Sequence, residues 1–147
     1  MRFGLMLPTA REGLYLPAGF STSQQLVQLA VQAERLGFYS LWGNDHLTLP
    51  KEARNRYNRP PNVYEVLITL AFIGAAAHKV RLGVAALSLP LREPVVLAKQ
   101  LATLDVFSNG RLAIAVGVGQ YREEFTQVRP SQSKADRGAM LEEMLRP

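Results

Sequence analysis

Asp45 and His46 form the only histidine–carboxylate pair that is adjacent in this 147-residue chain. They follow Asn44, directly after a short apolar segment over residues 38–42 that is typical of a β-strand. Imidazole exchanges protons near neutral pH, so His46 could donate a hydrogen bond to a ligand or move a proton on it. The alternative is that Asp45 caps a turn and His46 packs as a satisfied histidine. Spacing alone favours this structural interpretation and leaves the chemical one open.

Gly117 and Gly119 form a second candidate, because they end another apolar segment, residues 111–116. Gly117-Val118-Gly119 resembles the start of a phosphate-binding loop. Arg122 stands where the pattern G-x-G-x-x-G needs its third glycine, which disfavours a Rossmann dinucleotide site. The two glycines more simply allow the backbone to approach a flat ligand closely.

Other chemistries lack their residues. Glu123 and Glu124 are neighbours in the sequence, and adjacent helical residues do not face one another, so no paired catalytic carboxylates are expected. There is no G-x-S-x-G elbow and no cysteine, and the two histidines have no metal-binding spacing. Because cysteine is absent and the histidines lack this spacing, we expect no metal site. The Trp42 side chain could form one wall of a site for a planar ligand, although composition favours a place in the interior of a barrel.

Four strand–helix repeats are expected to position these residues. Apolar segments bounded by turn residues predict strands over residues 2–7, 38–42, 80–87 and 111–116. Helical spacing predicts helices from caps at Ser21–Ser23 to Gly37, over residues 63–78, from Pro94 to the Ser108-Asn109-Gly110 turn, and over residues 134–146. Residues 9–20 and 47–62 are expected to be loops. The candidate residues all follow strand ends, and ligands of parallel α/β folds bind at that edge.

Length and composition indicate one globular domain over residues 1–147, since 48% of the residues are hydrophobic. No apolar run is long enough for a signal sequence or a membrane span, so a cytoplasmic protein without membrane contact is expected. The net charge is +5, and four of the basic residues lie within one polar loop: Lys51, Arg54, Arg56 and Arg59. This loop is either solvated or faces an anion. No nucleic-acid-binding signature accompanies it.

Four strand–helix units amount to half of an eightfold barrel, which takes about 250 residues when complete. A parallel half-barrel leaves its inner face uncovered, whereas parallel sheets are normally buried on both faces. A second copy, a missing half, or a rearranged packing of the same elements would have to cover that face. An open doubly wound sheet is the alternative architecture, since four strands do not by themselves reveal closure.

Three segments carry motifs that together are typical of one known family. They read ERLGFYSLWGNDHLTLP, VRLGVAALSLPLREPVVLAKQLATLDVFSNGRLAIAVGVGQYREEF and RGAMLEEMLRP. Within them, Asp-His follows the second strand, an aliphatic-Pro-x-Arg-x-Pro motif precedes the third helix, and Ala-Thr-Leu-Asp is followed by Ser-x-Gly-Arg. These segments resemble the luciferase-like monooxygenase family. More narrowly, they are similar to its flavin- and deazaflavin-dependent oxidoreductases, and the resemblance covers the N-terminal half of their barrel.

The resemblance implies an α/β barrel of the TIM type with a flavin or deazaflavin ring across the carboxyl ends of its strands. His46 and Asp45 match the position beside the reactive face of the ring. Ala85-Ala86 falls where members often have a non-prolyl cis peptide bond, and Gly117 and Gly119 match the close-approach loop. Gln120 stands where some deazaflavin relatives carry an acid.

The implied function is hydride transfer between coenzyme F420, a deazaflavin, and a small organic substrate. His46 would hydrogen-bond or deprotonate the substrate, with Asp45 tuning it, and the basic loop mildly favours the phosphodiester and glutamates of F420. An FMN-dependent monooxygenase is one alternative. The other is a catalytically silent half-barrel that pairs only with itself, as a homodimer, or with a missing barrel half.

Overall fold

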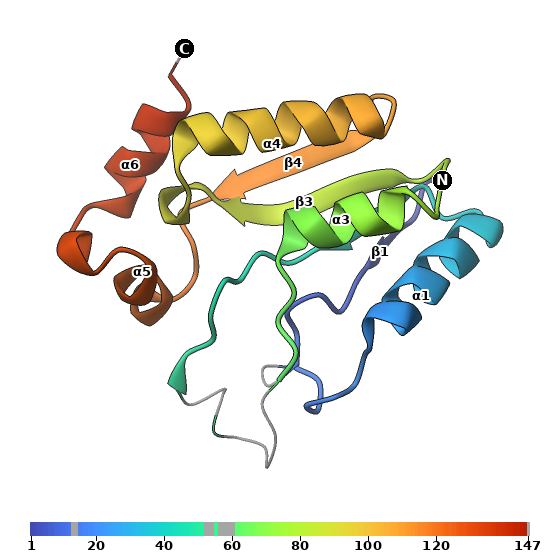
Figure 1. Ribbon diagram of the computed structural model, residues 1–147, viewed down its shortest axis with the longest axis horizontal. Coiled ribbons are helices and arrows are strands. Elements are labelled where there is room, and N and C mark those ends of the chain that lie inside the picture. The colour runs from blue at the N-terminus through green and yellow to red at the C-terminus, as the bar shows by residue number, and fades with distance from the viewer. Residues whose placement is uncertain (13–14, 52–54, 56–60, 147) are drawn as a thin grey trace.

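A parallel sheet of four strands forms the centre of the chain, in a computed structural model that describes residues 1–12, 15–51, 55 and 61–146 (Figure 1). The strands are β1 (Gly4–Met6), β2 (Ser40–Gly43), β3 (Arg81–Ser88) and β4 (Leu112–Gly117). They lie side by side in chain order. The expected strand–helix repeat and the half-barrel are confirmed, and this order differs from that of a doubly wound sheet, whose strand order reverses at a switch point.

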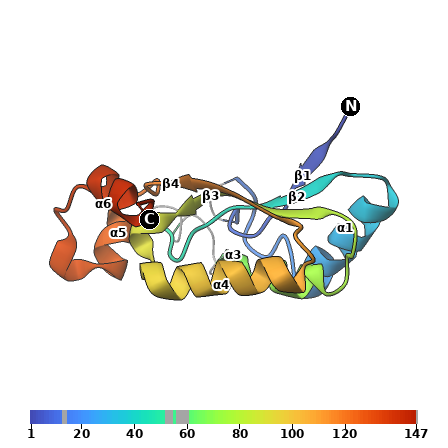
Figure 2. The ribbon, with the colours of Figure 1, turned by 90° about the horizontal axis from the view of Figure 1, so that it is seen from above.

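Three helices cover one face of the sheet and leave the other face open (Figure 2). They are α1 (Ser23–Arg35), α3 (Val66–Gly74) and α4 (Pro94–Phe107). Leu41, Leu82 and Val84 point toward these helices and are fully buried in the core that the helices complete. None of the helices in the described part of the chain is long and apolar enough to span a bilayer.

The expected helix ends are confirmed where local chemistry sets them. Thr22 caps α1 through a capping box with Gln25, and Gly37 follows the helix with a φ of 83°. Pro94 is the first residue of α4. The helix predicted over residues 63–78 is shorter, because the Glu65 side chain accepts a hydrogen bond from Ile68 N (2.8 Å) and caps a helix that starts at Val66.

Arg111 fixes the end of α3 to the start of β3 and explains the Ser-x-Gly-Arg motif. Its guanidinium donates to the carbonyls of Gly74, Ala77, Val80 and Ser108 over distances of 2.6–3.1 Å. Most of these carbonyls lie at or beyond the end of a helix, where backbone acceptors lack helical partners. The arginine therefore satisfies acceptors that neighbouring backbone leaves unpaired.

Two helices lie beyond the carboxyl ends of β3 and β4 (Figure 1). α6 (Arg137–Met144) was expected, although it is shorter than residues 134–146 because Asp136 caps it. α5 (Arg122–Val128) is not among the helices predicted from the sequence. It has only seven residues and no side-chain cap hydrogen bond at Tyr121, so its sequence carries little of the usual helix signal. Two short 3₁₀ turns, η1 (Leu89–Leu91) and η2 (Pro130–Gln132), complete this end.

Trp42 dominates the open face of the sheet. Side chains alternate along a strand, so Trp42 lies opposite to the buried Leu41. Its Nε1 donates to Ser40 Oγ (2.9 Å). A Cβ at Gly83 of β3 would collide with the indole, and one at Gly4 of β1 would lie 2.9 Å from Nε1. The indole therefore spreads over two neighbouring strands that carry glycine beneath it.

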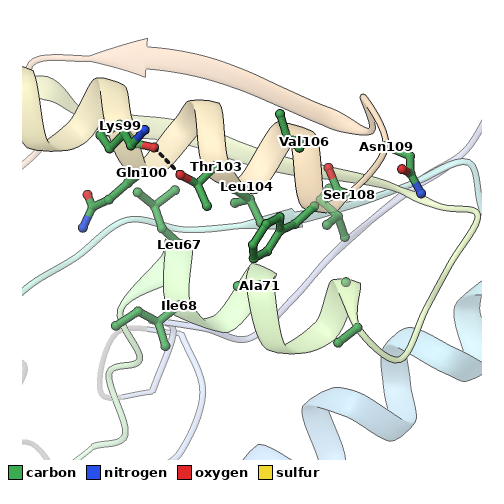
Figure 3. A pocket seen from close by; sticks show the side chains of 14 residues that line it. Leu67, Ile68, Ala71, Lys99, Gln100, Thr103, Leu104, Val106, Ser108 and Asn109 are labelled. Atoms are coloured by element: carbon green, nitrogen blue, oxygen red, sulfur yellow. Dashed lines mark hydrogen bonds between the residues drawn. The ribbon is translucent and has the colours of Figure 1, made fainter.

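An apolar groove of about 740 Å³ separates α3 from α4 on the outer surface (Figure 3). Leu67, Ile68 and Ala71 line it from α3, and Leu104 and Val106 line it from α4. Thr103 lies in the groove with its hydroxyl bonded to the Lys99 carbonyl (2.8 Å).

Glu12 joins the loops that follow β1 and β2. Its buried carboxylate accepts hydrogen bonds from the backbone nitrogens of Gly19 (2.6 Å), Ser21 (2.9 Å) and Asn62 (2.8 Å). Burial alone would raise the pKa of Glu12, but the N–H groups of Asn62, Ser21 and Gly19 outweigh it and hold the pKa below its ordinary value. The basic residues Arg54, Arg56 and Arg59 of the second loop lie outside the described residues.

We expect Glu12→Gln to reduce stability at neutral pH by about 1–3 kcal/mol, because one charged acceptor of three backbone N–H groups is lost. The folded carboxyl has the lower pKa, so its contribution exists above the unfolded value and disappears as pH falls through the folded value. Urea unfolding at a series of pH values should show wild type and variant converging in acid. Glu142→Gln, on the exposed side of α6, serves as the control, and a gap that persists in acid would contradict the assignment.

Candidate active site

A cavity of about 300 Å³ opens at the carboxyl ends of β2, β3 and β4. The lining residues are Asn44, Asp45, His46, Ala85, Ala86, Ser88, Val118, Gly119 and Gln120. Six of the seven residues predicted for the site therefore surround one space. The seventh, Gly117, is the last residue of β4 and pairs with Ser88, outside the lining.

Asp45 is engaged with neighbouring backbone and with a partly buried arginine. Its Oδ2 accepts a hydrogen bond from Ser88 N (2.8 Å), and its Oδ1 accepts one from Arg92 Nη2 (2.5 Å). Arg92 also contacts Glu65 (2.8 Å), and the Asp45 side chain is fully buried. Burial would lower the pKa of the Arg92 guanidinium, but Asp45 and Glu65 raise it above its ordinary value. Asp45 therefore ties the end of β2 to the end of β3 as a charged pair.

His46 pairs with Glu124, a contact that the sequence did not indicate. Nδ1 of His46 lies 3.1 Å from Oε2 of Glu124, and the side chain of Glu124 is 1% exposed. The other oxygen, Oε1, accepts from the backbone nitrogens of Leu47 (2.6 Å) and Thr48 (3.2 Å). The Tyr121 ring lies 5.5 Å from the imidazole, centroid to centroid. The carboxylate on the imidazole is thus Glu124, where the sequence had suggested Asp45.

Helices α5 and α6 hold the loops around the cavity through charged side chains. Glu123, next to Glu124 on α5, accepts from Lys51 N (3.2 Å), so the two acids together take three backbone N–H groups of the loop after β2. Arg137 of α6 donates to the carbonyl of Gly119 (2.9 Å). The two adjacent glutamates thus both reach the same loop, as acceptors of backbone N–H groups.

Residues Ala85 and Ala86 contribute small side chains to the wall of the cavity. The peptide bond between them is cis, and the pairing of β3 with β4 shifts register between Val84 and Leu87. Ala86 is exposed, as expected for a residue that faces the opening. The prediction that a non-prolyl cis bond could occur here is confirmed.

The loop after β4 forms the opposite wall. Gly119 has a φ of 84°, a conformation that side-chain-bearing residues rarely adopt, and a Cβ there would lie 3.5 Å from Ser88. A Cβ at Gly117 would lie 3.3 Å from the Ala86 methyl group. Gln120 is exposed at the rim and carries an amide, which cannot act as an acid.

Glu124 and Arg92 are the site residues that sequence reasoning missed. Glu124 lies 78 positions from His46, and Arg92 lies 47 positions from Asp45. The only sequence signal for Arg92 was its place in the Pro-x-Arg-x-Pro motif, and Glu124 had none beyond its charge. Among the described residues, no group of three or more histidine, cysteine or acidic side chains could hold a metal ion.

The geometry suits a flat ring better than a phosphate. Ala85, Ala86 and Gly119 contribute little side-chain bulk to the walls, and His46, held at Nδ1 by Glu124, also lines the space. The arrangement can therefore hold a planar group and move a proton beside it. A parallel half-barrel with a cavity at the carboxyl ends of its strands defines the class: an α/β barrel protein, in which this end of the strands is where ligands generally bind.

Comparison with known proteins identifies the family. The profile of the luciferase-like monooxygenase family matches residues 1–146, and the chain belongs to this family. It is 31% identical over 123 residues to the F420-dependent glucose-6-phosphate dehydrogenase of Kineococcus radiotolerans, covering 83% of this chain and 35% of that protein. It is 27% identical over 121 residues to the oxygenase component of the flavin-dependent trigonelline monooxygenase of Acinetobacter baylyi, covering 82% of this chain and 31% of that protein.

A solved structure shows the same fold. The oxygenating constituent of 3,6-diketocamphane monooxygenase from Pseudomonas putida, in complex with FMN, superposes with a TM-score of 0.74 at 22% identity. The alignment covers 99% of this chain and 37% of that one. The chain thus spans about a third of the length of the relatives that it matches.

Proposed function

We propose that this chain supplies the ring-binding half of an oxidoreductase that transfers hydride between coenzyme F420 and a small organic substrate. The observation that carries the proposal is the cavity itself, in which His46, the small residues Ala85 and Ala86, and Gly119 surround one space at the carboxyl ends of the strands. Walls formed by such small residues would leave room for a planar ring. When bound, the deazaflavin accepts the hydride, and the protein supplies orientation and proton transfer.

His46 would act on the substrate hydroxyl. Oxidation of an alcohol removes a hydride from carbon and a proton from oxygen, and the proton needs an acceptor within hydrogen-bond reach. Because Nδ1 of His46 faces Glu124, Nε2 is the ring nitrogen that would accept the substrate proton. Asp45 holds the backbone that carries His46 and takes no part in the transfer, since both of its oxygens are engaged by Ser88 and Arg92.

An FMN-dependent monooxygenase is the second candidate, because the flavin-dependent relative is as well aligned along this chain as the F420-dependent one. In that case His46 would donate a hydrogen bond beside the ring. The preference for F420 rests on the basic residues of the loop after β2.

The open face of the sheet also has to be covered in the working protein. Trp42 and Met6 lie on this face, and Met6 is 37% exposed. Parallel sheets are normally buried on both faces. We propose that a further barrel half covers it, contributed by a second copy of the chain in a homodimer or by additional chain. A half-barrel that only assembles, without binding a cofactor, is the alternative that the following experiment separates.

A binding titration of the purified chain tests the proposal. We expect saturable binding of coenzyme F420 with a micromolar dissociation constant, weakened by competition with FMN only at higher FMN concentration. Preferential FMN binding would instead support the monooxygenase. Sedimentation equilibrium on the same samples measures whether the binding species is a monomer or a dimer.

Two matched variants make the titration specific to the cavity. Ala86→Leu places a larger side chain in the cavity wall and should abolish binding, whereas Ala98→Leu changes an exposed alanine of α4 outside the lining and should not. Absence of saturable binding for both cofactors, or wild-type binding by Ala86→Leu, would overturn the proposal.

A further inference from the structure

We propose that Glu124 is a positioning residue that keeps the proton of neutral His46 on Nδ1, so that Nε2 presents a lone pair toward the cavity. The proposal concerns the proton on the imidazole and rests on the proposed function only for its catalytic consequence. It follows from the number of donors and acceptors in one buried cluster.

The carboxylate of Glu124 has no donor to offer. An ionised carboxylate only accepts hydrogen bonds, and Oε1 already accepts two, from Leu47 N and Thr48 N. Oε2, 3.1 Å from Nδ1 of His46, therefore needs a proton on that nitrogen. With the proton on Nε2 instead, two lone pairs would face each other at this distance in a place that is closed to water, since Glu124 is 1% exposed.

Glu124 cannot turn away to avoid this contact without losing other bonds. The N–H groups of Leu47 and Thr48 directly follow His46 in the chain, so one side chain fixes both the imidazole and the backbone that carries it. His46 itself is 8% exposed and packs beside Tyr121 at the start of α5. α5 therefore acts as a support for the imidazole from outside the sheet.

The glutamine variant gives a sharp prediction. Glutamine has one acceptor oxygen, and the two backbone N–H groups at Oε1 require it, which directs the amide NH₂ of Glu124→Gln toward Nδ1 of His46. Nδ1 must then accept, and the proton moves to Nε2. A substitution of nearly identical shape is thus expected to exchange the two tautomers.

The test is nitrogen NMR of the ¹⁵N-labelled full chain without cofactor, at a pH above the ordinary titration range of imidazole. Long-range ¹H–¹⁵N correlation distinguishes the protonated from the unprotonated ring nitrogen. We expect the Nδ1–H form for His46 in the wild type and the Nε2–H form in Glu124→Gln. The chain has two histidines, and the exposed His78 provides a reference imidazole in the same spectrum.

Glu123→Gln is the matched control, since Glu123 is the adjacent acid on α5 and its carboxylate accepts from Lys51 N. It should leave the His46 tautomer unchanged. The Nε2–H form in the wild type, or an unchanged tautomer in a folded Glu124→Gln variant, would overturn the proposal. If Glu124→Gln does not fold, the wild-type spectrum still decides.

The catalytic consequence is measured separately. If the chain turns over an alcohol, Glu124→Gln should lower kcat by about 10²–10⁴-fold, in the range seen when a base is held in the wrong tautomer. The NMR result does not depend on a cofactor or a substrate. Failure of the proposed function therefore leaves the tautomer result standing, and failure of the tautomer result leaves the cofactor titration standing.

Discussion

Replacing Arg92 with methionine is expected to destabilise the protein by about 3–5 kcal/mol, the range found when one partner of a buried ion pair is removed. The variant leaves the fully buried carboxylate of Asp45 with Ser88 N as its remaining donor. It also removes the charge that faces Glu65. The unfolding free energy from urea titration at neutral pH measures the loss, and the slope of the transition shows whether the folded state is otherwise preserved.

A second substitution separates lost charge from lost packing. Asp45→Asn combined with Arg92→Met removes both charges of this ion pair, and the amide oxygen introduced by Asp45→Asn can still accept from Ser88 N. This double variant should be more stable than Arg92→Met alone. Arg146→Met changes an exposed arginine after α6 and should stay within about 0.5 kcal/mol of wild type. A loss below about 1 kcal/mol for Arg92→Met would show that Asp45 does not depend on this pair.

The second large effect is expected in turnover rather than in stability. His46→Ala should lower kcat for the proposed hydride transfer by about 10²–10⁴-fold, because it removes the group that we propose as the acceptor of the substrate proton. Reduction of coenzyme F420 by the substrate, followed by absorbance, measures this. Cofactor affinity should change little, since His46 is one of nine residues that line the cavity.

Two further variants show that the loss is chemical. His46→Gln can still donate a hydrogen bond to Glu124 but accepts no proton near neutral pH. It should be as inactive as His46→Ala while it keeps the wild-type unfolding midpoint. His78→Ala, at an exposed position after α3, should be fully active. Wild-type turnover by His46→Gln would remove His46 from the proton transfer.

The parts of the fold that could be predicted are those whose causes are local. Pro94, Gly37 and Thr22 act through their own backbone geometry or through residues within three positions, so the sequence indicates these helix ends directly. The alternation of strands and helices then places every strand end at one edge of the sheet. For that reason the sequence alone is enough to group residues such as His46 and Gly119 in one cavity.

The parts that could not be predicted depend on contacts between distant segments. Glu124 finds His46 only because α5 packs against the loop after β2, and α5 itself has little intrinsic helix signal. Adjacency in the sequence suggested Asp45 as the partner of the imidazole. Neighbouring residues at a strand end point in different directions, and Asp45 turns instead to Ser88 and Arg92.

The fluorescence of Trp42 can report whether the open face of the sheet is covered. Trp42 is the only tryptophan in the chain, and its indole lies on the open face of the sheet above Gly4 and Gly83. Indole fluorescence therefore comes from one known place, free of contributions from the helix-covered face. Any body that covers the open face will move this emission to shorter wavelength, so assembly can be followed without a label.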